Sequence, residues 1–245
     1  MDRLVHIAAS GARQLMARQD AIAQNLANVS TPGYRAQTAA ARAVPLAGSG
    51  ARVFALEVAT GADLTPGPVE PTGRALDVAV QGPGWIAVQA ADGREAYTRA
   101  GSLEAGASGV LQTRAGHAVL GEGGPISVPP EHRIEIARDG TVSAIPEGRP
   151  LAAVLVLGRI KLVNPPAASL ERGADGLFRT RDGAPAPADP EVGLVAGALE
   201  GANVNAAEAL VGMIGVARQF ELHMKLVAQA DDNARRAASL LNVTA

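Results

Sequence analysis

Residues that could support catalysis or bind a metal are few and scattered along this 245-residue chain. The four histidines are His6, His117, His132 and His223. None has a second histidine at the short spacing that protein metal sites use. The chain has no cysteine, which excludes disulfides, thiolate ligands and cysteine nucleophiles. We therefore expect structural or surface roles for the histidines, and no metal site.

The glycine clusters and carboxylates also lack the context of an active site. Gly82-Pro83-Gly84 and Gly121-Glu122-Gly123-Gly124 do not lie between a strand and a helix, where phosphate-binding loops occur. Turns or bulges explain them better. No Gly-x-Ser-x-Gly elbow is present, and the aspartates fall in turns without forming a carboxylate pair. The sequence predicts no catalytic residue, no cofactor and no enzymatic activity.

Asn25 and Asn28 are unusual because they interrupt the apolar face of a predicted helix. One interpretation is that the helix frays before Pro32, with Asn28 or Ser30 capping carbonyl groups. The other is that both amides form hydrogen bonds across subunits and fix the register, as buried asparagines do in coiled coils. Asp231 raises the same question near the C-terminus, where a solvent-facing position is the alternative.

Long amphipathic helices are predicted at both ends of the chain. Apolar residues recur every three or four positions over 3–29 until Pro32, and over 206–242 without interruption by proline. The second stretch gives a coiled-coil-like seam. The predicted seam residues, with the two asparagines, are Leu4, Leu15, Ile22, Asn25, Leu26, Asn28, Leu210, Met213, Ala217, Phe220, Met224, Val227 and Leu241.

The middle of the chain has the pattern of a β domain. Residues 36–75 are rich in Ala, Pro and Gly and predict an extended connector with one strand, 53–59. From residue 76, short alternating runs separated by turns such as Asp92-Gly93 predict an all-β, sandwich- or barrel-like domain. The run 151–157 predicts a strand buried on both faces. The expected fold is therefore mixed α and β, with terminal helices that pair as a coiled-coil-like bundle around a central β domain.

Charge and hydropathy narrow the function classes further. The formal net charge of -2 argues against nucleic-acid binding. The longest apolar run is too short to cross a bilayer, and the first residues do not have the pattern of a cleaved signal peptide. We expect a cytoplasmic protein, unless it leaves by a route that does not read such a signal.

Four segments, taken in order along the chain, form a specific pattern. The first is 23–35, AQNLANVSTPGYR, and the second is 77–85, DVAVQGPGW. The third is 97–103, YTRAGSL, and the last comprises 197–204, GALEGANV, with Met213-Ile214 and 218–221, RQFE. Together they resemble the bacterial flagellar rod and hook proteins. Within that family the features are most similar to a proximal rod subunit.

This resemblance implies a structural subunit of the basal-body rod, located in the periplasm and exported without a cleaved signal peptide. The implied partners are proximal and distal rod proteins, copies of itself and the flagellar type III export apparatus. Domains are expected at 1–35 (N-terminal helix of the rod core), 36–75 (connector), 76–195 (β domain) and 196–245 (C-terminal helix of the rod core). The alternatives are a distal rod or hook-type subunit, or a ligand-binding β domain with helical oligomerisation arms.

Overall fold

The computed structural model describes residues 2–45, 53–130, 132–146 and 154–242. These residues fall into two compact units. The helical unit contains Met1–Asn28, Gln37–Asp63 and Val204–Ala245, and the β-rich unit contains Val29–Ala36 and Leu64–Asn203. The expected mixture of α and β structure, with two long helices and a central β-rich domain, is confirmed.

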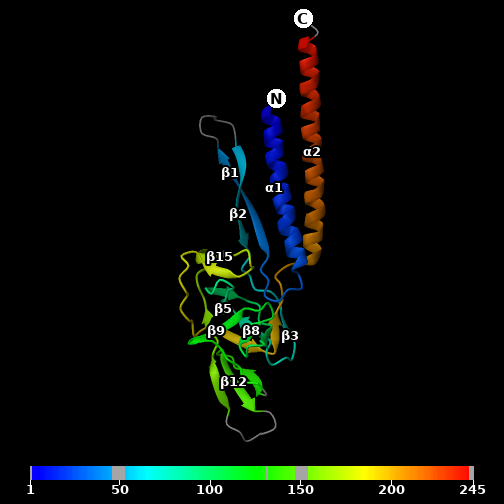
Figure 1. Cartoon of the computed structure of the whole chain (residues 1–245). Helices are drawn as coiled ribbons and strands as arrows, with labels where there is room; N and C mark the ends of the chain where they lie inside the picture. Colours follow the sequence, from blue (N-terminus) through cyan, green and yellow to red (C-terminus); the bar gives the residue numbers. More distant parts are fainter. Residues whose placement is uncertain (1, 46–52, 131, 147–153, 243–245) are drawn as a thin grey trace. The chain divides into compact units, whose positions relative to one another are not determined.

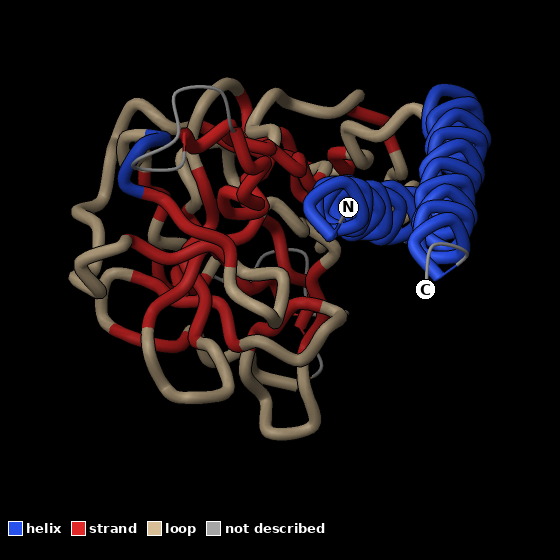
Figure 2. Tube along the Cα trace, turned by 90° about the horizontal axis from the view of Figure 1, so that it is seen from above, coloured by secondary structure: helices blue, strands red, loops and turns tan. Residues whose placement is uncertain are grey.

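Two antiparallel helices dominate the helical unit, α1 (Asp2–Ala27) and α2 (Ala206–Asn242). They lie side by side in both views (Figures 1 and 2) and contact each other. A Cβ added at Gly11 of α1 would lie 2.7 Å from the His223 ring of α2. One added at Gly212 of α2 would lie 3.4 Å from Ile22. Small residues thus allow close approach of the helices at two levels.

The helix ends follow from local side chains. Asn28 donates from its side-chain amide to the carbonyl of Gln24 at 2.9 Å, at the end of α1. Asn205 accepts hydrogen bonds from the backbone N–H groups of Ala207 and Glu208 and caps the start of α2.

A β-hairpin completes the helical unit and corrects one expectation. Residues 36–75 do not form a connector with a single strand, because β1 (Gln37–Pro45) pairs antiparallel with β2 (Val53–Ala62). Both strands contact α1. Tertiary packing of this kind stabilises strands in Ala-rich sequences that have little intrinsic strand preference.

The β-rich unit consists of short antiparallel strands. Its largest sheet has the order β15-β16-β6-β5-β9-β8-β7, with β10 paired to β9 and β14 to β5. Smaller sheets are β11-β12-β13, β17-β4 and β18-β3. The bounds of the strands are β3 Val69–Pro71, β4 Val78–Gln81, β5 Trp85–Gln89, β6 Glu95–Thr98, β7 Leu103–Ala105, β8 Leu111–Thr113, β9 Ala118–Gly121, β10 Gly124–Pro125, β11 His132–Ile136, β12 Thr141–Pro146, β13 Leu155–Arg159, β14 Leu162–Val163, β15 Leu170–Arg172, β16 Phe178–Thr180, β17 Gly193–Ala196 and β18 Ala198–Glu200. A short 3-10 helix, Ala167–Ser169, precedes β15.

One apolar core joins these sheets. Val80, Ile86, Val119, Val142 and Leu194 belong to different strands and are all buried in it. The hairpin predicted at Asp92-Gly93 is confirmed between β5 and β6. Because all these pairings are antiparallel, short turns suffice to connect many of the strands.

The described part of 151–157 differs from the prediction of a strand buried on both faces. Residues 151–153 lie outside the described part of the chain, and the edge strand β13 covers Leu155–Arg159. Val154, Leu155 and Val156 are exposed rather than buried on both faces. An apolar run alone does not distinguish a central strand from an edge strand.

Candidate functional site

The carboxylate of Glu200, the last residue of β18, accepts three hydrogen bonds within the β-rich unit. Its Oε1 accepts hydrogen bonds from Arg35 (2.6 Å) and from the backbone N–H of Gly67 (2.8 Å). Its Oε2 accepts from Arg99 at 2.8 Å. Arg35, Arg99 and Glu200 are 1%, 4% and 1% exposed. We call these three residues the junction.

The electrostatics of the junction favour an ionised Glu200. Burial alone raises the pKa of this carboxyl, but the hydrogen bonds from Arg99 and Arg35 outweigh it and lower the pKa below its usual value. Arg99 also donates to the carbonyl oxygens of Val80 and Gly82. Two guanidinium groups therefore share one carboxylate, and the carbonyl groups help to accommodate the additional positive charge.

Trp85 forms one side of the junction. Its ring centroid lies 5.9 Å from the Arg35 guanidinium carbon and 5.7 Å from that of Arg99. The negative face of an indole attracts such cations. The ring also packs on Phe178, with centroids 4.6 Å apart. Trp85 is buried, and its neighbours are the two arginines and Phe178.

Glycines allow backbone segments to meet at the junction. Gly33 adopts φ +71, and a Cβ there would lie 2.2 Å from the carbonyl carbon of Arg99. Its N–H donates to the carbonyl oxygen of Glu200 at 2.7 Å. A Cβ at Gly67 would lie 2.2 Å from the carbonyl oxygen of Gly201. Only glycine fits at these two positions without movement of the backbone.

The arrangement can anchor chain segments, and we find no substrate site around it. It brings together residues 33–35, Gly67, Arg99 and Glu200, which are distant in the sequence. A buried carboxylate that already accepts from two arginines and an amide has little capacity to bind a ligand. The junction is therefore a structural site.

The predicted seam residues of α1 have mixed environments. Leu15, Ile22, Leu26 and Asn28 are partly buried, whereas the side chain of Leu4 lies outside the described residues. The Asn25 amide binds the backbone of Gln37 in the same chain. Its Oδ1 accepts at 2.7 Å and its Nδ2 donates at 3.0 Å. This intrachain pairing was not expected from the sequence.

On α2, three of the six seam residues with described side chains are partly buried in the single chain, and three are exposed. Val216 is buried, and Met213, Phe220, His223 and Val227 are partly buried. The remaining seam positions are exposed, at Leu210, Ala217 and Met224, or lie outside the described side chains, at Leu241. Asp231 is exposed and pairs with Arg235, as its solvent-facing interpretation predicted.

The outer surface of α2 is strongly apolar. Leu222 is 59% exposed and Met224 47% exposed. The other exposed large apolar residues of this helix are Leu210, Val211, Ile214 and Leu226. A helix that is apolar on several faces is normally covered by neighbours. In this helical unit those faces have no cover among the described residues.

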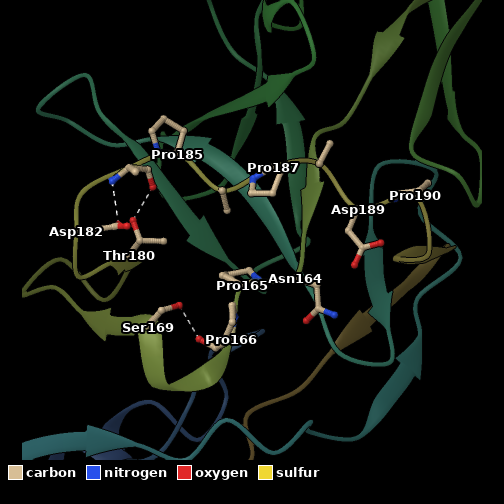
Figure 3. A pocket seen from close by; sticks show the side chains of 13 residues that line it. Asn164, Pro165, Pro166, Ser169, Thr180, Asp182, Pro185, Pro187, Asp189 and Pro190 are labelled. Atoms are coloured by element: carbon tan, nitrogen blue, oxygen red, sulfur yellow. Dashed lines mark hydrogen bonds between the residues drawn. The ribbon is translucent and has the colours of Figure 1, made fainter.

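A hollow in the β-rich unit bears on the ligand-binding alternative. It has a volume of about 460 Å³ and is lined by prolines of 164–166 and 184–190 (Figure 3). Its polar side chains make local turn contacts: Asp182 accepts from the Ala184 N–H, and Thr180 donates to the Ala184 carbonyl. Ser169 donates to the carbonyl of Pro166. The hollow therefore offers few polar groups to orient a ligand.

The described residues contain no group of three His, Asp or Glu side chains placed to hold a metal ion. No helix in that part of the chain has the length and hydropathy needed to span a membrane.

The sequence motifs contained the junction residues, but we predicted no role for them. The motif 23–35 ends with Arg35. Arg99 lies in the middle of 97–103, and Glu200 lies in the centre of 197–204. A usable signal is the alternation in β18, where Ala198 and Glu200 share the buried face. A glutamate on a buried strand face requires a cationic partner.

Three parts of the chain match flagellar families. Residues 6–35 match "Flagella basal body rod protein", and residues 79–144 match "Flagellar hook protein FlgE/F/G D1 domain". Residues 195–240 match "Flagellar basal body rod FlgEFG protein C-terminal". Each matched region contributes one residue of the junction: Arg35, Arg99 and Glu200, respectively.

The similarity extends over the full length of relatives. The flagellar basal-body rod proteins FlgF of Escherichia coli and Salmonella typhimurium are 47% and 46% identical to this chain, with all of both sequences covered. The rod protein FlgG of Agrobacterium fabrum is 33% identical over 95% of this chain and 97% of its own. The chain belongs to the family of flagellar basal-body rod proteins. Its identity to the two FlgF proteins is higher than to this FlgG.

Proposed function

We propose that this chain is a structural, non-enzymatic subunit of the flagellar basal-body rod, in its proximal part. The observation that carries this proposal is that each of the three regions matching the flagellar families supplies one residue of a single buried junction. The regions that match the flagellar families therefore also supply the residues that join distant segments of the chain. The junction has the composition of a structural anchor and lacks that of a catalytic centre.

The proposed mechanism is polymerisation through the terminal helices. Leu210, Met224 and the other exposed apolar residues of α2 would become buried against helices of neighbouring subunits in a coiled-coil-like arrangement. Burial of apolar surface contributes about 25 cal/mol for each Å² removed from water. The helices would surround the central channel of the rod, with the predicted seam residues of α1 and α2 as contacts.

The proposed partners are other rod subunits, proximal and distal, and copies of this chain. We also propose that the flagellar type III apparatus exports the chain to the periplasm, because its relatives are proteins of the flagellar basal-body rod. The distal rod alternative is less well supported, since identity to the FlgG relative is lower.

Deletion of the gene in its flagellated host tests the proposal. Purified basal bodies imaged by electron microscopy should show a rod arrested near its membrane-proximal end, and cells should lack filaments. The intact gene on a plasmid should restore both. Complete rods and normal swimming in the deletion strain would contradict the proposal.

A further inference from the structure

Asn203 is hydrogen-bonded to three other residues of the β-rich unit. Its Oδ1 accepts from the backbone N–H of Ala36 at 2.7 Å. Its Nδ2 donates to the carbonyl of Thr65 at 3.0 Å, and its own N–H donates to the carbonyl of Tyr34 at 3.3 Å. One residue thus joins segments that are more than a hundred positions apart.

The position of these contacts is informative. Ala36 and Asn203 are the last residues of the two chain segments that form the β-rich unit, and Thr65 is next to the first residue of the second segment. The chain passes into the helical unit directly after Ala36, directly before Leu64 and directly after Asn203. The Asn203 contacts therefore lie at three of the positions where the chain passes between the two units.

The exit at Ala36 is held on both sides. The N–H of Ala36 donates to Asn203 inside the β-rich unit. The N–H of the next residue, Gln37, donates to Oδ1 of Asn25 at 2.7 Å inside the helical unit. Two consecutive amides thus bind asparagine side chains from the N-terminal and C-terminal motifs. An amide side chain suits this role because it supplies an acceptor and donors at once.

We propose that Asn203 is a positioning residue for rod assembly, which holds together three of the four ends of the chain segments that form the β-rich unit. This inference rests on the proposed function as a rod subunit. Glu200, three residues earlier, anchors the same segments inside the unit, whereas Asn203 acts at their ends. Its loss should therefore impair assembly more than the stability of the β-rich core.

The test compares Asn203→Ala with two controls expressed in the deletion strain. Asn164→Ala removes an exposed asparagine of the same unit, and Val119→Ala weakens the buried core. Stability is measured by urea unfolding of the purified chains, followed by fluorescence of the single tryptophan, Trp85. Assembly is measured as the amount of each variant in purified basal bodies, relative to the amount exported.

Asn203→Ala should lower incorporation by at least about tenfold, the change that loss of a well-formed hydrogen bond can produce in an equilibrium. Val119→Ala should unfold at lower urea than Asn203→Ala yet assemble better, and Asn164→Ala should match the wild type. Asn203→Asp keeps the acceptor for Ala36 but loses the donor to Thr65, so it should assemble to an intermediate level.

Normal assembly of both Asn203 variants would overturn the inference. So would losses of assembly that follow stability across the three alanine variants, because Asn203 would then act only through the fold. If cells degrade Asn203→Ala, the Asn203→Asp variant decides by the same criteria. A deletion strain with complete rods would instead contradict the proposed function itself, which keeps the two failures distinguishable.

Discussion

Arg35 and Glu200 are separated by 165 positions in the sequence and form a buried ion pair with a nitrogen–oxygen distance of 2.6 Å. This pair joins the end of the N-terminal motif to the centre of the 197–204 segment of the C-terminal motif. Arg99 binds the other oxygen of the same carboxylate and adds the central motif. The three family regions are therefore joined at one charged group, which makes Glu200 the first residue to vary.

Replacement of Glu200 by Gln should lower the free energy of unfolding by about 3–5 kcal/mol, because two buried arginines lose their counter-charge. Urea unfolding monitored by Trp85 fluorescence measures this change. Glu171→Gln, at an exposed position of β15, is the matched control and should leave the midpoint unchanged. Equal midpoints for the two variants would show that the junction contributes little to stability.

Stability should also fall in acid through Glu200. Burial raises the pKa of this carboxyl, but the hydrogen bonds from Arg99 and Arg35 prevail, so the folded-state pKa lies below the unfolded one. The contribution is therefore complete above the unfolded value of about 4.3 and is lost as the pH falls through the folded pKa. Urea midpoints between pH 6 and about pH 3 should fall more steeply in the wild type than in Glu200→Gln. Parallel slopes would contradict this assignment.

Gly33→Ala and Gly73→Ala form a matched pair. Both glycines have positive φ, +71 and +73, but only Gly33 is crowded by the backbone of Arg99. The left-handed conformation alone costs an alanine about 1–2 kcal/mol. Gly33→Ala should therefore destabilise the chain clearly more than Gly73→Ala in urea unfolding. Equal losses of stability in the two variants would mean that the backbone segments at Gly33 and Arg99 can move apart at no cost in free energy.

Met224→Asp should separate folding from assembly. Met224 is exposed in the single chain, so the purified variant should keep its helix content and its urea midpoint. In the assembled rod the new carboxylate would be buried without a partner, at a cost of several kcal/mol. Swimming of cells that carry the variant should therefore fail, whereas Gln229→Asp on the same helix should be tolerated. Normal swimming with Met224→Asp would remove this position from the proposed interface.

Periodicity predicted the helices and most strands because their apolar residues repeat locally. The range of α2, 206–242, and the hairpin at Asp92-Gly93 both follow from nearby residues. The β1–β2 hairpin depends on contacts with α1, which its own Ala-rich sequence does not encode. The pattern did not show which residues of α2 would be covered within the single chain, because apolar residues occupy several of its faces.

The junction could not be predicted because its partners are far apart in the sequence. Arg35, Arg99 and Glu200 were all within recognised motifs, yet a motif does not state which residues meet. Asn25 illustrates the same difficulty: its amide was considered for contacts between subunits, and it pairs with Gln37 in its own chain. Local patterns predict elements, whereas the pairing of polar groups depends on the folded topology.

Cysteine labelling of α2 tests the central claim most directly, since the chain has no native cysteine. Leu222→Cys places a thiol at a residue that is 59% exposed in the single chain, and Ala91→Cys provides an exposed control in the β5–β6 turn. A maleimide should label both variants as purified monomers. In purified basal bodies Leu222→Cys should be protected while Ala91→Cys still reacts. Equal labelling of Leu222→Cys in monomer and basal body would contradict the claim that polymerisation buries the terminal helices.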